Sequence, residues 1–254
     1  MSNNFDPNQN HYIYIEKDTT PLIFIHGVGL DHQMWSPQID NLTEFSTITY
    51  DLLGHGKTPC RKDKLSLNDF SNQLTEILEY LQINKIHLIG FSLGSLIALD
   101  FVSKMQNKVD KLILIGTTYK RTIEERSLVI DRYNQAKLNK PISKQALKRW
   151  FTDKYLEENP MTYDLFMNIL NKKSVDHKNF LKAYELFANH EDATPLIQGI
   201  SSKTLVMTGS DDPGSTPAMS KKLAKDIPNS SYVEIKSGKH LCSIECADDV
   251  NMKI

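Results

Sequence analysis

Residues 85–98 read KIHLIGFSLGSLIA. The Ile- and Leu-rich beginning is typical of a buried strand, and the apolar spacing of the end is typical of a helix. Between them stands a Gly-x-Ser-x-Gly motif centred on Ser92, with Gly90 and Gly94 as its glycines. Such motifs also occur by chance, but a preceding strand and a following helix are the context of a nucleophile elbow. Its tight turn leaves no room for a Cβ at the glycines and exposes the hydroxyl, so we predict that Ser92 is a nucleophile.

The flanking segments alternate between strand and helix patterns. Besides the elbow strand and its helix, which is expected to end near residue 105, we expect strands at 11–16, 21–25, 46–50, 111–116, 204–208 and 231–235, and helices at 31–42, 67–81, 217–227 and from 241 onward. This alternation predicts an α/β fold with a mostly parallel sheet and right-handed crossovers. Residues 1–10 are expected to be a loose tail, and the last helix is expected to be short.

The alternation stops after residue 118. Residues 119–190 have helical patterns and no convincing strand, and Pro141 and Pro160 interrupt them. We therefore predict three or four helices that form an inserted cap. The expected organisation is a core of residues 1–118 and 196–254 with a helical cap of residues 119–195.

A nucleophilic serine needs a base, and the base needs a group that orients it. In an open α/β sheet, such groups follow the carboxyl ends of strands. His240 comes after the strand at 231–235, and Asp212 comes after the strand at 204–208. We predict His240 as the general base and Asp212 as its orienting carboxylate, with Asp211 as the alternative.

The reaction also needs donors for the oxyanion. The amide of Leu93, directly after the nucleophile, is one predicted donor, and the amide of Val28, in the loop after the strand at 21–25, is the other. His26 and Gly27 are expected to shape that loop, with no chemical role for the His26 side chain.

Composition excludes several classes of protein. The 254 residues are 40% apolar and 24% charged with a net charge of -1, which favours a globular domain and argues against nucleic acid or an anionic membrane as the main partner. No stretch has the apolar length of a membrane span, and the N-terminus lacks a signal-peptide core, so a cytoplasmic location is expected. Three cysteines do not make a disulfide framework. We expect no metal, no cofactor, a small acyl substrate, and a monomer or homodimer.

Together these motifs resemble the α/β-hydrolase superfamily. The resemblance is carried by HGVG at 26–29, Trp35, YDLLGHG at 50–56, the elbow at 90–94, GSDDP at 209–213 and GKHL at 238–241. Within the superfamily, these motifs look most like the branch of 3-oxoadipate enol-lactonases and carboxylesterases. The resemblance implies a serine-dependent hydrolase, since the dehalogenases and epoxide hydrolases of this fold carry an aspartate at the position of Ser92. It also implies two strands before residue 21, where this sequence shows one clear strand.

The expected activity is hydrolysis of a small carboxylic ester or lactone through an acyl-serine. A C–C bond hydrolase of ring-cleavage products, or a receptor that senses a small ligand with the same pocket, are the alternatives. The cap is expected to select the substrate, and one inward-facing arginine would suit a substrate with a carboxylate. The candidate cap residues are Arg121, Arg126, Arg132, Arg149, Trp150, Tyr155, Tyr163, Phe166, Phe180, Tyr184 and Phe187.

Overall fold

The computed structural model describes residues 4–60, 62–138, 143–171 and 177–254. Within these residues one sheet has the strand order β1-β2-β4-β3-β5-β6-β7-β8. The strands are β1 (Asn4–Phe5), β2 (His11–Ile15), β3 (Leu22–Ile25), β4 (Thr47–Tyr50), β5 (Ile86–Phe91), β6 (Val109–Ile115), β7 (Lys203–Gly209) and β8 (Ser230–Ile235). The pairs from β4 to β8 are parallel, whereas β1 and β2 are antiparallel additions at one edge. The predicted fold class, an α/β fold with a mostly parallel sheet, is confirmed.

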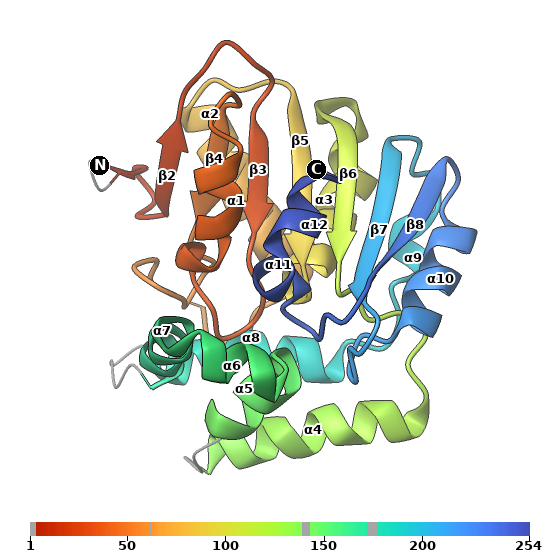
Figure 1. The fold of residues 1–254 in the computed structure, drawn as a ribbon. Helices are drawn as coiled ribbons and strands as arrows, with labels where there is room; N and C mark the ends of the chain where they lie inside the picture. Colours follow the sequence, from red (N-terminus) through yellow and green to blue (C-terminus); the bar gives the residue numbers. More distant parts are fainter. Residues whose placement is uncertain (1–3, 61, 139–142, 172–176) are drawn as a thin grey trace.

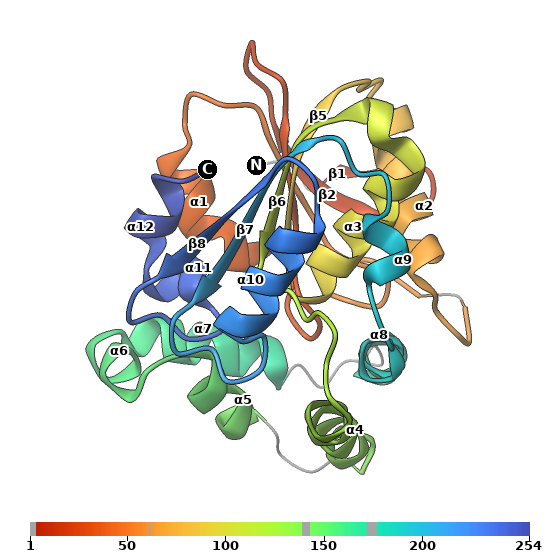
Figure 2. The ribbon, with the colours of Figure 1, turned by 90° about the vertical axis from the view of Figure 1, so that its right-hand side faces the viewer.

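Helices cover both faces of the sheet (Figures 1 and 2). One face carries α2 (Leu67–Tyr80), α3 (Leu93–Met105), α9 (Thr194–Ile197) and α10 (Pro217–Asp226), and the other carries α1 (Ser36–Asn41), α11 (Cys242–Glu245) and α12 (Ala247–Asn251). Short 3-10 turns, η1 (His32–Trp35) and η2 (Gln106–Lys108), precede α1 and β6. Because both faces are covered, the central strands can be apolar throughout.

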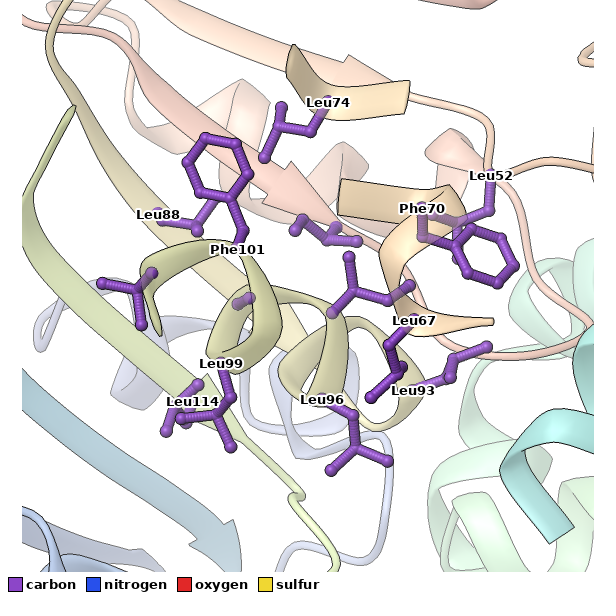
Figure 3. Close-up of a cluster of buried hydrophobic side chains, with 14 of the residues drawn as sticks. Leu52, Leu67, Phe70, Leu74, Leu88, Leu93, Leu96, Leu99, Phe101 and Leu114 are labelled. Carbon is purple, nitrogen blue, oxygen red and sulfur yellow. The ribbon is translucent and has the colours of Figure 1, made fainter. Parts of the chain in front are cut away.

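The alternation of side chains along β3 divides the interior into two clusters. Ile23 and Ile25 point into the cluster under α2 and α3, while Leu22 and Phe24 point into the cluster under α1 and α11. The period of two residues in a strand produces this division. Figure 3 shows the first cluster, in which α2 and α3 pack on each other and on the sheet through leucine and phenylalanine side chains.

Helix α2 illustrates how the local sequence builds these elements. The Ser66 hydroxyl accepts from the Asp69 amide, while the Asp69 carboxylate accepts from the Ser66 amide, which makes a capping box at the first turn. Phe70, Leu74 and Ile77, at helical spacing, are fully buried. The cap fixes where the helix begins, and the apolar stripe fixes which face meets the sheet.

Five described helices lie between β6 and α9 in the chain. They are α4 (Ile123–Lys137), α5 (Ser143–Trp150), α6 (Asp153–Glu158), α7 (Pro160–Leu170) and α8 (His177–Asn189). We call them the inserted helices, and Figure 1 shows them across the carboxyl ends of the parallel strands. The expected number of three or four is too low, because the chain breaks at Phe151 and again at Asn159, where Pro160 begins a new helix. Pro141 lies outside the described residues.

The two ends of the chain differ from the prediction. Residues 1–10 were predicted to be a loose tail, but Asn4 and Phe5 pair with β2. The Asp6 carboxylate accepts from the amide and the side chain of Asn10, which closes the connecting turn. At the other end, the expected single helix is divided at Cys246 into α11 and α12.

Candidate active site

Ser92 lies at the sharp turn between β5 and α3. Its backbone has φ 54° and ψ -116°, a strained conformation for a residue with a side chain. A Cβ at Gly90 would lie 2.4 Å from the Gly94 carbonyl oxygen, and one at Gly94 would lie 2.3 Å from that of Ile25. Both glycines are therefore required by close backbone contacts, as the sequence motif predicts.

His240 and Asp212 are brought together from separate loops. Nδ1 of His240 lies 2.6 Å from Oδ2 of Asp212, and the other carboxylate oxygen accepts from the amides of Gly214 and Ser215 at 2.8 and 2.9 Å. The Asp212 side chain is fully buried, whereas that of His240 is 15% exposed. Asp211, the alternative carboxylate, is exposed and contacts the Ser210 hydroxyl instead. The partner of His240 is thus Asp212.

Gly209 allows these two loops to meet. A Cβ at Gly209 would lie 2.2 Å from the carbonyl oxygen of Gly238 and 2.4 Å from that of Lys239. The Asp211 amide also donates to the Gly238 carbonyl at 3.0 Å. The end of β7 therefore packs directly against the loop that presents His240.

The imidazole of His240 reaches the elbow itself. Its ring centroid lies 4.8 Å from that of Phe91, the residue before Ser92. Gly116, at the end of β6, has φ +59°, and a Cβ there would lie 3.3 Å from both the His240 ring and the Phe91 ring. Gly116 was not among the predicted site residues, although a glycine at the end of a predicted strand was a visible signal.

The loop after β3 lies against the nucleophile. A Cβ at Gly27 would lie 2.9 Å from the Phe91 ring and 3.2 Å from Cβ of Ser92. Val28 follows in this loop, and Leu93 is the first residue of α3, where helix amides have no intrahelical acceptor. The two predicted oxyanion donors therefore belong to the two segments next to the serine, the loop after β3 and the start of α3.

Two buried histidines hold this loop in place. His26 donates from Nδ1 to the Gly27 carbonyl at 2.8 Å, and its Nε2 accepts from the Leu52 amide at 2.9 Å. Nε2 of His55 accepts from the Gly29 amide at 3.0 Å. Burial lowers the pKa of both imidazoles, that of His55 to about 3, so each ring is neutral at pH 7 and can accept a hydrogen bond. His26 thus has the expected structural role, whereas the role of His55 was missed, because Gly29 is 26 residues away from it.

A cavity lies between the sheet and the inserted helices. Its volume is about 780 Å³, including space open to solvent. Ser92, His240, Asp212 and Val28 line it on the side of the sheet. The lining from the inserted helices comprises Val129, Arg132, Ala146, Arg149, Trp150, Leu170, Phe180, Tyr184 and Phe187. The candidate triad therefore opens into a mostly apolar space.

The four candidate arginines of the inserted segment have different positions. Arg121 is buried and donates to the carbonyls of Phe187 and His190, and Arg126 pairs with Glu191. Arg132 and Arg149 both line the cavity. Two of the four candidate arginines therefore line the cavity.

The remaining aromatic candidates divide in a similar way. Trp150, Phe180, Tyr184 and Phe187 line the cavity. Tyr155, Tyr163 and Phe166 pack in the cluster under α1 and α11.

Among the described residues, His11, His32 and Asp51 place potential metal ligands within 4.8 Å of one another. The Asp51 carboxylate accepts from Nδ1 of both histidines, at 2.8 and 2.7 Å, and from the amides of His32 and Lys57. These four donors occupy the lone pairs of the Asp51 carboxylate. The cluster therefore links β2, the end of β4 and η1 by hydrogen bonds.

Comparison with known proteins places the chain in a family. The family model for the alpha/beta hydrolase fold matches residues 20–246. An (E)-2-((N-methylformamido)methylene)succinate hydrolase of Acinetobacter baylyi is 27% identical over 96% of this chain and 92% of that protein. 3-Oxoadipate enol-lactonase 2 of the same organism is 24% identical over 93% of this chain and 87% of that protein.

Solved structures agree with this assignment. An enol-lactonase from Burkholderia xenovorans LB400 superposes with a TM-score of 0.86 at 23% identity, covering 96% of this chain and 95% of the other. A thermophilic esterase from Thermogutta terrifontis superposes with a TM-score of 0.85 at 24% identity, covering 99% and 94%. No described helix is long and apolar enough to cross a membrane. The chain belongs to the α/β-hydrolase family and is related to enol-lactonases.

Proposed function

We propose that this protein is a serine hydrolase that cleaves a small carboxylic ester or lactone through an acyl-Ser92 intermediate. The observation that carries the proposal is that Ser92, at a strained elbow, shares one cavity with His240, which is bound through Nδ1 to a buried Asp212. A carboxylate only accepts hydrogen bonds, so the proton lies on Nδ1, and the lone pair of Nε2 is free to act as a base.

In the first half-reaction, Ser92 Oγ attacks the carbonyl carbon while His240 Nε2 takes the hydroxyl proton. The amides of Val28 and Leu93 hold the oxyanion of the tetrahedral intermediate. When the C–O bond to the leaving group breaks, His240 gives the proton to the alcohol, which stays attached to the acyl group if the substrate is a lactone. Water then attacks the acyl-serine, again with His240 as base, and the acid is released.

The inserted helices, within residues 119–195, would act as the cap of this site. They supply the apolar and cationic walls of the cavity, while the sheet supplies the candidate triad. The name of one relative supports the lactone chemistry, since that relative is a 3-oxoadipate enol-lactonase.

Labelling with a fluorophosphonate, followed by mapping of the modified residue, tests the proposal. We expect modification at Ser92, and Ser92→Ala should lower kcat on an ester by about a million-fold. Ser103→Ala, an exposed serine on the same helix, serves as the matched control. Full ester hydrolysis by Ser92→Ala would contradict the proposal.

A substrate panel separates this activity from the two alternatives. Turnover of a dienolic ketoacid in preference to simple esters would indicate a C–C bond hydrolase. A stable ligand adduct with negligible turnover would indicate a receptor.

A further inference from the structure

Two guanidinium groups line the cavity of the candidate active site, and neither has a paired carboxylate among the described residues. Arg132 comes from α4 and Arg149 comes from α5. Within residues 4–60, 62–138, 143–171 and 177–254, no carboxylate oxygen lies within 4 Å of either guanidinium, whereas Arg126 has Glu191 as a partner. The Arg149 guanidinium donates from Nη1 to the Gln145 carbonyl, one turn earlier in its helix.

The positive charges of these two arginines repel each other. Burial, followed by the charge of Arg132, lowers the pKa of Arg149 to about 10. The Arg149 side chain is still cationic at pH 7, and Asp212, whose charge favours this cation, already uses its oxygens for His240, Gly214 and Ser215. Like charges in a partly buried site are stabilised by an anion that they share.

Tyr184 adds a third donor from α8. Burial raises the pKa of its hydroxyl, and the neighbouring charges of Arg132 and Arg149 only partly offset this effect, so the hydroxyl stays protonated. Ring contacts with Tyr133 at 5.7 Å and Phe180 at 5.6 Å fix its orientation. Planar, forked guanidinium groups and a hydroxyl match the oxygens of a carboxylate.

We propose that Arg132, Arg149 and Tyr184 form a carboxylate subsite, so that the preferred substrate is a small ester or lactone with a free carboxylate at the far end of its acyl chain. This inference rests on the proposed serine hydrolase activity. The apolar side chains that line the same cavity, among them Phe180 and Phe187, would contact the carbon chain of the substrate.

Two esters of matched length test the subsite. Monomethyl glutarate carries the carboxylate, and methyl hexanoate replaces it with an apolar end; hydrolysis of each is followed at constant pH by titration. In Arg132→Met and Arg149→Met, we expect the ratio of kcat/KM for the anionic ester to kcat/KM for the neutral ester to fall by about 10- to 100-fold. Arg149→Lys should lose less, because it keeps the charge but not the fork.

Arg126→Met is the matched control, because Arg126 lies on the same helix as Arg132 and pairs with Glu191. The ratio should be the same in this variant as in the wild type. Circular dichroism of each variant shows whether it is folded, and Arg149→Gln replaces Arg149→Met if the latter does not fold.

Binding of glutarate to Ser92→Ala, measured by calorimetry, gives a readout without catalysis. We expect binding that weakens by about 10- to 100-fold when Arg132→Met or Arg149→Met is added. Absent binding, or binding that is equal in all variants, would overturn the subsite even if Ser92 is labelled and methyl hexanoate is hydrolysed. Arginine-dependent binding without labelling of Ser92 would instead support the subsite and contradict the proposed hydrolysis.

Discussion

Nδ1 of His240 lies 2.6 Å from Oδ2 of Asp212, and the same imidazole contacts the tilted ring of Phe91, next to Ser92, with 4.8 Å between the ring centroids. The carboxylate thus fixes the tautomer of the imidazole, and the elbow fixes its position. The amides of Gly214 and Ser215 fix the carboxylate in turn. Each proposed catalytic group is therefore held by a neighbour that does not react.

The Asp212–His240 contact predicts the effect of Asp212→Asn. An asparagine would present either an amide donor or a weaker neutral acceptor to Nδ1, so the tautomer needed for catalysis would no longer be favoured. We expect kcat on an ester to fall by about 10⁴-fold with little loss of folding stability. Asp211→Asn changes the same charge one residue away, on an exposed side chain, and should leave kcat near the wild-type value. Equal losses in the two variants would refute the assignment of Asp212.

Gly116 is predicted to contribute separately to folding stability and to catalysis. Gly116→Ala strains the backbone at φ +59° and also places a Cβ 3.3 Å from the His240 ring, so stability should fall by about 1–2 kcal/mol and kcat by at least about tenfold. Gly199 provides the control, since it has φ +80° and no atom within 4 Å of an added Cβ. Gly199→Ala should lose similar stability and keep its kcat. Urea denaturation and ester kinetics on both variants measure the two effects.

The buried neutral histidines predict loss of stability in acid. The folded pKa of His55 is about 3, below the ordinary value of 6.5, so the unfolded chain binds more protons below pH 6.5. Its contribution is complete above pH 6.5 and is lost as the pH falls from there toward 3. His26, whose pKa is also lowered by burial, acts in the same direction.

We expect the free energy of unfolding by urea to fall between pH 6 and pH 4.5 by at least about 1.4 kcal/mol per pH unit. His55→Gln can still accept from the Gly29 amide but does not titrate, so its slope should be smaller by about that amount. A pH-independent stability over this range would show that these imidazoles are protonated in the folded protein.

Asp51 is predicted to be a structural carboxylate. Burial acts to raise its pKa, but the hydrogen bonds from His11 and His32 hold this pKa well below its usual range. Asp51→Asn would leave one of the two imidazole donors facing an amide, so we expect a loss of about 3 kcal/mol or more in the free energy of unfolding. Because donors fill the carboxylate, Zn²⁺ should not raise the melting temperature; a large increase would instead indicate a metal site.

Much of the fold could be read from local sequence patterns. The strand at 86–91, the helix after it and the strands at 203–209 and 230–235 follow from apolar runs, periodicity and glycine positions. Short or divided elements were missed for a local reason. Strand β1 has two residues and no periodicity, and the break at Cys246 lies inside one continuous apolar pattern.

The sequence by itself determined the sheet, the elbow at Ser92 and the two loops that carry Asp212 and His240, because these depend on the spacing of neighbouring residues. Only the tertiary structure decided that Arg132 and Arg149 face the cavity while Arg121 and Arg126 do not, and that His55 holds the Gly29 amide. These arginines look alike in the local sequence, and their positions differ because different segments of the chain pack against them. That information lies in contacts between segments far apart in the chain, so no local pattern contains it.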